Sequence, residues 1–459
     1  MTSTVSATAL LVIASATARA QGQAATPAPA AVHQDAAVRS VAKWIGGDLP
    51  ELGAVAPAPP PEALAGNPGQ TTLAELEQIA LANNPTLAQA TRRVQALRGK
   101  QVQSGLYPNP VVGYIGEEIG DEGRGGQQGA FFAQEIVTAG KLRLNRAVVS
   151  HEIAKAQQDL EVQRLRVIND VRAAAYEVLV AQRTVKLDEQ LVRIGDEGKT
   201  AAEELLNAKE VSRVDMLQAR IEANSARLQL ENARNDYRAA WQRLAIVSGV
   251  PGMKPVPLED RLEGAFPELT WQESVSRLMA GSPELARAYA EVERAQCDLA
   301  RACAGRVPNF EVEAGARYNN ASEDTVATVQ VAVPLQLFNR NQGNIQRTRG
   351  ELAAARQNVR RVELSLQERL ADAFRQYANA RQQVQRYRDE ILPDAKESLD
   401  MVREGYGQGE FGYLELLTAQ RTYFRVNLAH VEGLRALWVS STRIEGMLLT
   451  GGLESPGSQ

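Results

Sequence analysis

The chain has 459 residues, a formal net charge of −4 and a sequence pI of about 5.8, a balance that does not favour nucleic-acid binding. Aromatic residues make up only 5%, which is low for a protein with a large compact core. Alanine, leucine, glutamine, arginine and glutamate dominate the long stretches, and these residues favour helix.

The beginning of the chain has features of a secretory signal peptide. A short apolar segment precedes Ala18, Arg19 and Ala20, which fit the small-x-small pattern at a signal cleavage site, although the usual basic residues are missing. Residues 21–70 are rich in Ala, Pro and Gly and predict an extended leader. No later apolar run approaches the roughly 18 residues of a transmembrane helix, so strands would have to make any membrane crossing.

Two short helices and a strand pair are expected next. Thr72 and Glu75 have the spacing of a helix-starting capping box, and the first helix is predicted to end before Pro85, because a residue that precedes proline is pushed out of the α region. A second helix is predicted to about Ser104. Strands are predicted in VVGYIGEEIG and AFFAQEIV, on either side of a glycine-rich turn. Their length of about ten residues suits a tilted membrane-spanning strand.

A helical hairpin without proline is predicted over residues 140–249. Its apolar positions step by three and four residues, as on one face of a helix. Gly195 and Gly198 are predicted to mark the turn between its arms, and Gly249 followed by Pro251 its end. An arm of about 50 residues would span roughly 75 Å, which no small globular core requires.

The second half repeats this pattern at an offset of about 200 residues, with Pro85 matching Pro283 and Asp215 matching Glu415. In its first strand, apolar Phe310, Val312, Ala314, Ala316 and Tyr318 alternate with Glu311, Glu313, Gly315 and Arg317. The resulting apolar face could contact lipid or a protein core. The predicted segments are a signal peptide (1–20), a leader (21–70), a first repeat (71–250), a linker (251–266), a second repeat (267–451) and a tail (452–459).

Four strands cannot close a barrel, and open sheet edges are costly in lipid, so membrane strands would require oligomerisation. A cyclic trimer would supply twelve strands and twelve long helical segments.

Several motifs resemble the TolC-like outer membrane factor family. They are the breaks at Pro85 and Pro283, the YPNP run at 107–110, and the glycine-rich run 405–411 that leads into YLELLTAQR at 413–421. The runs TAGKLR (138–143) and PLQLFNRNQGN (334–344) are similar to the heavy-metal branch, the outer membrane partners of cobalt-zinc-cadmium pumps.

This resemblance implies a mainly α fold with membrane β-strands. The chain would form a trimer whose 12-stranded β-barrel in the bacterial outer membrane continues into a long α-helical barrel in the periplasm. It would work with a periplasmic adaptor and an inner-membrane pump of the resistance-nodulation-division (RND) class. It would do no chemistry of its own, with no cofactor, no bound metal and no nucleic acid.

The hairpin tips are expected to form the periplasmic gate and the adaptor contact. Repeated acidic side chains there would favour cations, although ordinary helix capping and solvation is the alternative interpretation. The residues are Arg193, Asp196, Glu197, Arg388, Asp389 and Asp394. A structural helix break is expected halfway along the second hairpin, at Gly405, Gly407, Gly409 and Gly412.

Motifs for other chemistry are missing from the sequence. The glycine-rich turn lacks the Lys-Ser/Thr of a phosphate loop, and the three histidines have no ligand spacing. Cys297 and Cys303 would face different sides of one helix. The resemblance described above implies an efflux duct for divalent metal cations. The alternatives are a multidrug or type I secretion duct and, in another class, a soluble coiled-coil adaptor or scaffold.

Overall fold

The computed structural model describes residues 71–120, 125–209, 211–258, 262–264, 266–408 and 410–455. The predicted signal peptide and leader lie outside these residues, as do Gly409 and the end of the predicted tail. Within the described part, one order of elements occurs twice. The first set is α2 (Leu73–Asn83), α3 (Pro85–Gln103), β1 (Val111–Glu117), β2 (Gln127–Ile136), α4 (Lys141–Asn207) and α5 (Arg213–Val247). The second set is α6 (Trp271–Gly281), α7 (Pro283–Ala304), β3 (Phe310–Asn319), β4 (Asp324–Ala332), α8 (Gln342–Arg386), the π-helix η3 (Tyr387–Ile391), α9 (Leu392–Gln408) and α10 (Tyr413–Glu445).

The short helices begin and end where local signals predict. Thr72 and Glu75 form the predicted capping box at the start of α2. Asn84 ends α2 and caps α3, accepting a hydrogen bond from the Thr86 N–H at 2.9 Å, and Pro85 takes the first position of α3. Ser282 has the same role between α6 and α7. Each break therefore joins two helices directly.

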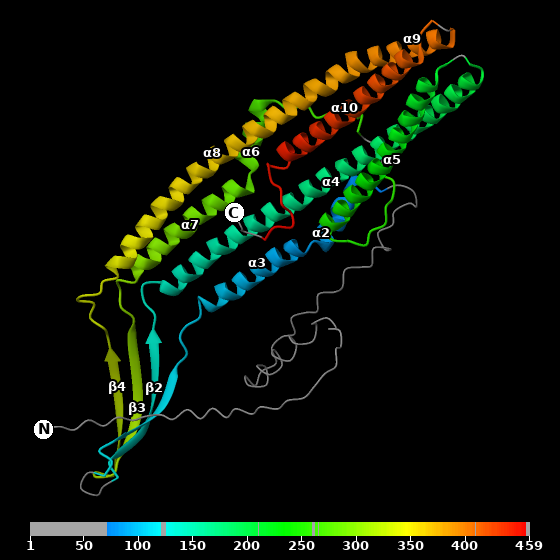
Figure 1. The fold of residues 1–459 in the computed structure, drawn as a ribbon. Helices are drawn as coiled ribbons and strands as arrows, with labels where there is room; N and C mark the ends of the chain where they lie inside the picture. Colours follow the sequence, from blue (N-terminus) through cyan, green and yellow to red (C-terminus); the bar gives the residue numbers. More distant parts are fainter. Residues whose placement is uncertain are drawn as a thin grey trace, which may run out of the picture. The chain divides into compact units, whose positions relative to one another are not determined.

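The four strands form one antiparallel sheet in the order β1-β2-β3-β4. In Figure 1 this sheet lies at one end of the long helices, and the turns of the two helical hairpins lie at the other. We call the ends of the helices next to the sheet proximal and the ends with the turns distal. The strands confirm the predicted segments to within a few residues.

The first hairpin (α4 and α5) differs from the prediction in its turn. Helix α4 continues for 67 residues through Gly195 and Gly198, and the chain reverses at residues 208–212. The prediction of a turn at these glycines was wrong because Gly195 serves packing instead. A Cβ at this position would lie 3.2 Å from the Cα of Ala223, so glycine allows α4 and α5 to approach closely.

The second hairpin (α8, η3, α9 and α10) differs in the same way. Helices α8, η3 and α9 follow one another without a break, with 45, 5 and 17 residues, through the predicted tip at Arg388, Asp389 and Asp394. Pro393 does not end the helix. Its ring would clash with the carbonyl four residues earlier in an α-helix, and the wider π-turn just before it relieves that clash.

The glycine-rich run 405–412 lies at the turn of the second hairpin and not, as predicted, halfway along it. Helix α9 ends at Gln408 and α10 begins after Gly412. The N–H of Glu410 donates to the carbonyl oxygen of Gly405 at 2.8 Å. The Phe411 ring packs on the same glycine so closely that a Cβ there would collide with it. Glycine is required at position 405 because this turn folds back on itself.

The hydrophobic core lies where α2 and α6 pack on the long helices α4, α8 and α10. Tyr377 of α8 is 1% exposed, and its hydroxyl donates to the carbonyl oxygen of Pro267 at 2.7 Å. Trp438 of α10 stacks on Tyr176 of α4 with ring centroids 4.8 Å apart. These contacts join the two halves of the chain midway along the hairpins. The fully buried aliphatic side chains here include Leu76, Val171, Val178, Leu278, Leu366, Leu370, Leu434 and Leu437.

Candidate functional site

The sheet has one charged face and one apolar face. Directly paired residues of antiparallel strands point to the same side, so the register assigns every side chain to a face. Glu135 lies opposite Glu311, and the alternation predicted in β3 is confirmed. One face carries all the charged residues of the strands, namely Glu117, Glu135, Glu311, Glu313, Arg317 and Asp324. The other carries mainly apolar residues, among them Val112, Tyr114, Ala130, Phe132, Val312, Ala314, Tyr318, Val329 and Val331.

The apolar face is exposed, with Val112 75% exposed, Val329 73% and Tyr114 66%. The described residues provide no core for this face, which excludes within them the soluble arrangement of a sheet packed on a protein interior. An exposed apolar surface of this kind marks contact with a membrane or a partner. In the described part of the chain, the outer edges of β1 and β4 pair with no other strand.

The distal turns are built differently in the two hairpins. The first contains Lys209 with φ +63°, followed by a capping box in which Ser212 and Asp215 satisfy each other's backbone N–H groups. The second ends at Gly412, which caps α10 without a side-chain hydrogen bond. The Ser-x-x-Asp signal at 212–215 is visible in the sequence and marks the true start of α5.

A groove between α4 and α5 contains three of the predicted tip residues. Its volume is about 800 Å³. It lies along the two helices, a few helical turns away from the distal end of the hairpin. Asp196 accepts a hydrogen bond from Arg227 at 2.6 Å, and Glu189 accepts one from Arg234 at 3.0 Å. Carboxylates outnumber guanidinium groups in the lining, which consists of Glu189, Val192, Arg193, Asp196, Glu197, Thr200, Ala201, Glu204, Leu230 and Arg234.

The other predicted tip residues lie around the π-helix. Arg388 and Asp389 pair with each other at 2.8 Å on an exposed surface, and hydrogen bonding from Arg388 lowers the pKa of the Asp389 carboxyl. Asp394 lies in the first turn of α9. Helix α9 ends 14 residues after Asp394, and α4 ends 11 residues after Asp196. At ~1.5 Å per residue the first set lies roughly 15–21 Å from its turn and the second set roughly 21–30 Å from its turn.

The two hairpins also contact each other near their distal ends. Arg421 of α10 forms a short bidentate ion pair with Glu222 of α5, and hydrogen bonding to this carboxylate raises the pKa of Arg421. Tyr413 lies beside Gly198 of α4, where a Cβ would lie 3.6 Å from its hydroxyl. Burial raises the pKa of Tyr413. Sequence analysis named the 413–421 run but not Glu222, because no local signal joins positions 199 residues apart.

Comparison with known proteins identifies the family. The family model described as outer membrane efflux protein matches this chain twice, over residues 76–250 and 274–448. The chain belongs to the outer membrane efflux protein family. It is therefore an outer membrane channel protein and not an enzyme.

Comparison with individual proteins also points to this family. The chain is 27% identical over 384 residues to the cobalt-zinc-cadmium resistance protein CzcC of Cupriavidus metallidurans, covering 83% of this chain and 90% of the relative. Its fold is similar to that of CusC, with a TM-score of 0.69, 17% identity and coverage of 85% and 96%. It is also similar to the outer membrane protein VceC of Vibrio cholerae, with a TM-score of 0.65, 17% identity and coverage of 83% and 97%.

In the described residues of this outer membrane efflux protein, no helix combines the length and the hydrophobicity needed to cross a membrane.

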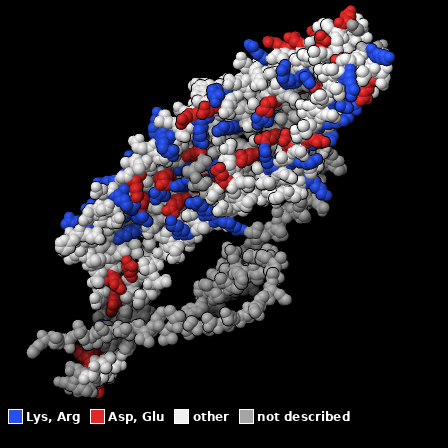
Figure 2. Space-filling model, viewed as in Figure 1, with Lys and Arg blue, Asp and Glu red and all other residues white. Residues whose placement is uncertain are grey.

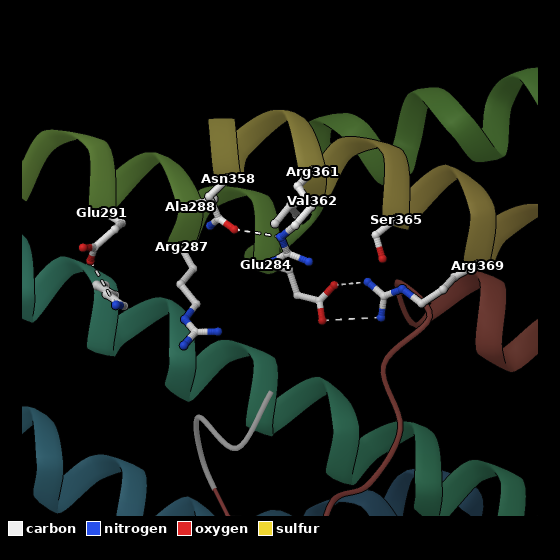
Figure 3. Close-up of a pocket in the computed structure, with 10 residues that line it drawn as sticks. Glu284, Arg287, Ala288, Glu291, Asn358, Arg361, Val362, Ser365 and Arg369 are labelled. Carbon is white, nitrogen blue, oxygen red and sulfur yellow. Dashed lines mark hydrogen bonds and ion pairs between the residues drawn. The ribbon is translucent and has the colours of Figure 1, made fainter. Parts of the chain in front are cut away.

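A charged cavity of about 420 Å³ lies between α4, α7 and α8 (Figure 3). Its charged groups bind one another rather than converge on an empty centre. Arg369 pairs with Glu284, Lys155 pairs with Glu291 at 3.0 Å, and Arg361 donates to Asn358 at 2.9 Å. Hydrogen bonds from Arg294 and Lys155 outweigh burial and lower the pKa of Glu291. These ion pairs join three helices of the efflux protein and have a structural role.

Metal-binding clusters are not found among the described residues, where no group of three or more His, Cys, Asp or Glu side chains could hold an ion. His430 is 7% exposed and packs near the Tyr387 ring, and burial lowers its pKa. His151 lies in the proximal part of α4, far along the chain from His430.

Proposed function

We propose that this protein is the outer membrane duct of a tripartite efflux system and passes divalent heavy-metal cations from the periplasm to the exterior. The observation that carries the proposal is the sheet, with one exposed apolar face, one charged face and two unpaired edges in the described chain. A lipid-facing wall with a polar lumen has this pattern. Multidrug or polypeptide export is the alternative within the family.

Three chains would complete the wall. The edges of β1 and β4 can pair between neighbours, which gives a closed barrel of twelve strands without open edges in lipid. The long helices would continue this barrel as a helical tube into the periplasm. An arm of 67 residues spans roughly 100 Å at ~1.5 Å per residue, a length that suits an aqueous compartment better than a single domain.

The charged face of the sheet supports a cation substrate. Five carboxylates and one guanidinium group lie on it, and Arg317 already pairs with Glu117. Glu135 and Glu311 lie directly opposite each other, although like charges in this arrangement destabilise a sheet. A lumen lined with carboxylates attracts cations. The similarity to a cobalt-zinc-cadmium resistance protein favours divalent metals.

The distal surface is the proposed contact for a periplasmic adaptor and, through it, for an RND pump in the inner membrane. The α4/α5 groove is open and combines charged side chains with apolar Val192, Ala201 and Leu230, which suits an amphipathic partner helix. Arg193, Asp196 and Glu197 contribute to it, and Arg388, Asp389 and Asp394 would extend the charged surface on the second hairpin, somewhat further from the turns.

The test is the ion selectivity of the purified trimer in planar bilayers. Glu311→Gln combined with Glu313→Gln should lower the ratio of cation to anion permeability, because two lumenal carboxylates per chain are lost. The matched control, Glu311→Asp with Glu313→Asp, keeps the charges and should keep the ratio. An unchanged ratio in the Gln variant contradicts the lumenal assignment.

In cells, deletion of the protein should sensitise growth to Zn²⁺, Co²⁺ or Cd²⁺ more than to dyes and detergents, and the reverse ranking would favour the drug duct.

A further inference from the structure

The four connections between the helices and the sheet, taken together with the adjoining one to three turns of helix, contain basic residues and no acidic ones. They are residues 98–110, 137–150, 302–309 and 333–350. This is unusual in a chain whose net charge is −4. In Figure 2, Lys and Arg side chains occur at the proximal ends of the helices, and acidic side chains lie on the sheet. The basic residues are Arg98, Lys100, Lys141, Arg143, Arg146, Arg306, Arg340, Arg347 and Arg349.

Within the described residues, most of these cations have no counterion. Lys100 pairs with Glu152 and Arg347 with Glu351, both at 2.6 Å, and Lys141 binds the carbonyl oxygen of Val307. For the other six, the described residues supply no ion pair, and all six are exposed. They are Arg98, Arg143, Arg146, Arg306, Arg340 and Arg349.

These cations lie within roughly 10 Å of the proximal helix ends at ~1.5 Å per residue, and contacts join the segments in pairs. The Arg146 side chain passes over Gly105 so closely that a Cβ on that glycine would collide with it, which joins α4 to the end of α3. Asn341 donates to the carbonyl oxygen of Ala302 at 2.7 Å, which joins the start of α8 to the end of α7. Like charges gathered in this way repel one another unless an anion from outside the chain lies among them.

Large apolar side chains are exposed at the same level. Phe338 is 90% exposed, Leu335 79% and Tyr107 68%. In the sequence, Tyr107 lies shortly before β1, and Leu335 and Phe338 lie shortly after β4. Aromatic and aliphatic side chains beside cations are typical of the boundary between the apolar and headgroup layers of a membrane.

We propose that this region binds the headgroups of anionic phospholipids in the membrane leaflet that faces the helices. We call it the junction belt and define it as Arg98, Arg143, Arg146, Arg306, Arg340 and Arg349 with Leu106, Tyr107, Leu335, Leu337 and Phe338. The inference rests on the proposed membrane-spanning role of the sheet. It adds that the protein selects lipids by charge at the level where its helices begin.

Charge complementarity favours lipid over a second copy of the chain. In a cyclic assembly, every copy places its junction belt at the same height, so a neighbour presents more positive charge and no carboxylate from these connections. A free phosphate ion would neutralise the guanidinium groups but would leave Phe338 and Leu335 in water. A phospholipid supplies both the phosphate and the acyl chains.

The experiment measures lipids retained by the purified full-length protein in mixed micelles with native mass spectrometry. The belt variant carries Arg143→Gln, Arg146→Gln, Arg306→Gln and Arg340→Gln. Its control carries Gln at four exposed arginines outside the belt, Arg213, Arg220, Arg403 and Arg425. At physiological salt we expect wild type and control to retain phosphatidylglycerol over phosphatidylethanolamine by roughly tenfold or more, and the belt variant by about twofold or less, since each cation near a membrane surface adds to the attraction.

Three outcomes would overturn the proposal. The belt variant could keep the full preference for phosphatidylglycerol. Inorganic phosphate alone could raise the melting temperature of the wild type as much as phosphatidylglycerol does, which would indicate a free-anion site. The variant could dissociate into monomers whatever the lipid, which would indicate an interface between copies. Recovery of the wild type without detergent would instead contradict the proposed function, and normal conductance with no lipid preference would contradict the belt alone.

Discussion

The first arms of the two helical hairpins are equal in length but differ in regularity and in how many side chains their distal parts bury. Helix α4 is regular over its 67 residues and still buries Leu187 and Ala202 in its distal part. The corresponding arm of the second hairpin is divided by the π-helix η3, and among the described residues its distal part, α9, buries only Gly405. Equal length with unequal burial means that the two arms resist bending to different degrees.

Local chemistry at the turns reinforces this difference. The first turn has a reciprocal capping box between Ser212 and Asp215, whereas Gly412 caps α10 without a side chain. Segments with few buried contacts and uncapped ends open at lower free energy than the rest of a fold. We therefore expect the distal part of the second hairpin to exchange its amide hydrogens faster than that of the first in the isolated chain.

The largest expected effect comes from a bulky side chain placed between the two helices of the first hairpin. Gly195→Leu should destabilise the contact of α4 with Ala223 by about 1–3 kcal/mol, because a side chain there meets backbone. The matched variant Gly407→Leu enters open space in α9 and should stabilise its helix by up to ~1 kcal/mol. Hydrogen-exchange mass spectrometry of the two hairpins measures both changes. Equal effects at the two glycines would show that the close approach at Gly195 does not constrain the first hairpin.

A smaller effect is expected from exchanging the caps. Ser212→Ala should cost the start of α5 about 1 kcal/mol, and Gly412→Ser should stabilise the start of α10 by a few tenths of a kcal/mol. Amide exchange in the first turns of α5 and α10 reports each change separately. If Ser212→Ala left exchange in α5 unchanged, the capping box would not explain the difference between the turns.

Local signals in the sequence were sufficient for much of the fold. The capping box at Thr72, the residue-proline breaks and the period of two in β3 act within a few residues, and each element they predict is present. The charged face of the sheet also follows from that period. The environment of the apolar face did not follow from it, because an alternating strand can face lipid or a core. The 73% exposed fraction of Val329 shows that no core covers this face within the described residues, and it supports the proposed contact with lipid.

The turns were not predictable from glycine and proline alone. Gly195 and Gly198 reflect the approach of α5 and Tyr413, which depends on packing between distant segments. Pro393 is accommodated by a π-turn that no local residue pattern announces. The ion pair of Glu222 with Arg421 joins separate hairpins. The Ser212–Asp215 capping box is a local signal at the true start of α5, and the sequence analysis did not use it.

The smallest expected effect concerns one position shared by the two arms. Counted from the first residue of its arm, Asp188 of α4 matches Asp389 of η3. Asp188 is 4% exposed, and burial raises its pKa, whereas hydrogen bonding from the exposed Arg388 lowers the pKa of Asp389. The same position thus holds a desolvated carboxyl in the better packed arm and a solvated one in the other.

The signs of the two pH dependences are opposite. The folded chain holds the proton of Asp188 more tightly than the unfolded chain does, so this residue lowers stability as pH rises from about 4, its ordinary pKa, through its raised folded pKa. Asp188→Asn should therefore raise the melting temperature at pH 7, by an amount equivalent to about 1 kcal/mol or less, with no gain below pH ~4. Asp389→Asn should give no gain at pH 7, because it removes a carboxylate whose ionised form Arg388 favours. Melting curves of both variants between pH 4 and pH 8 measure these changes, and a pH-independent gain from Asp188→Asn would mean that the buried carboxyl is not the cause.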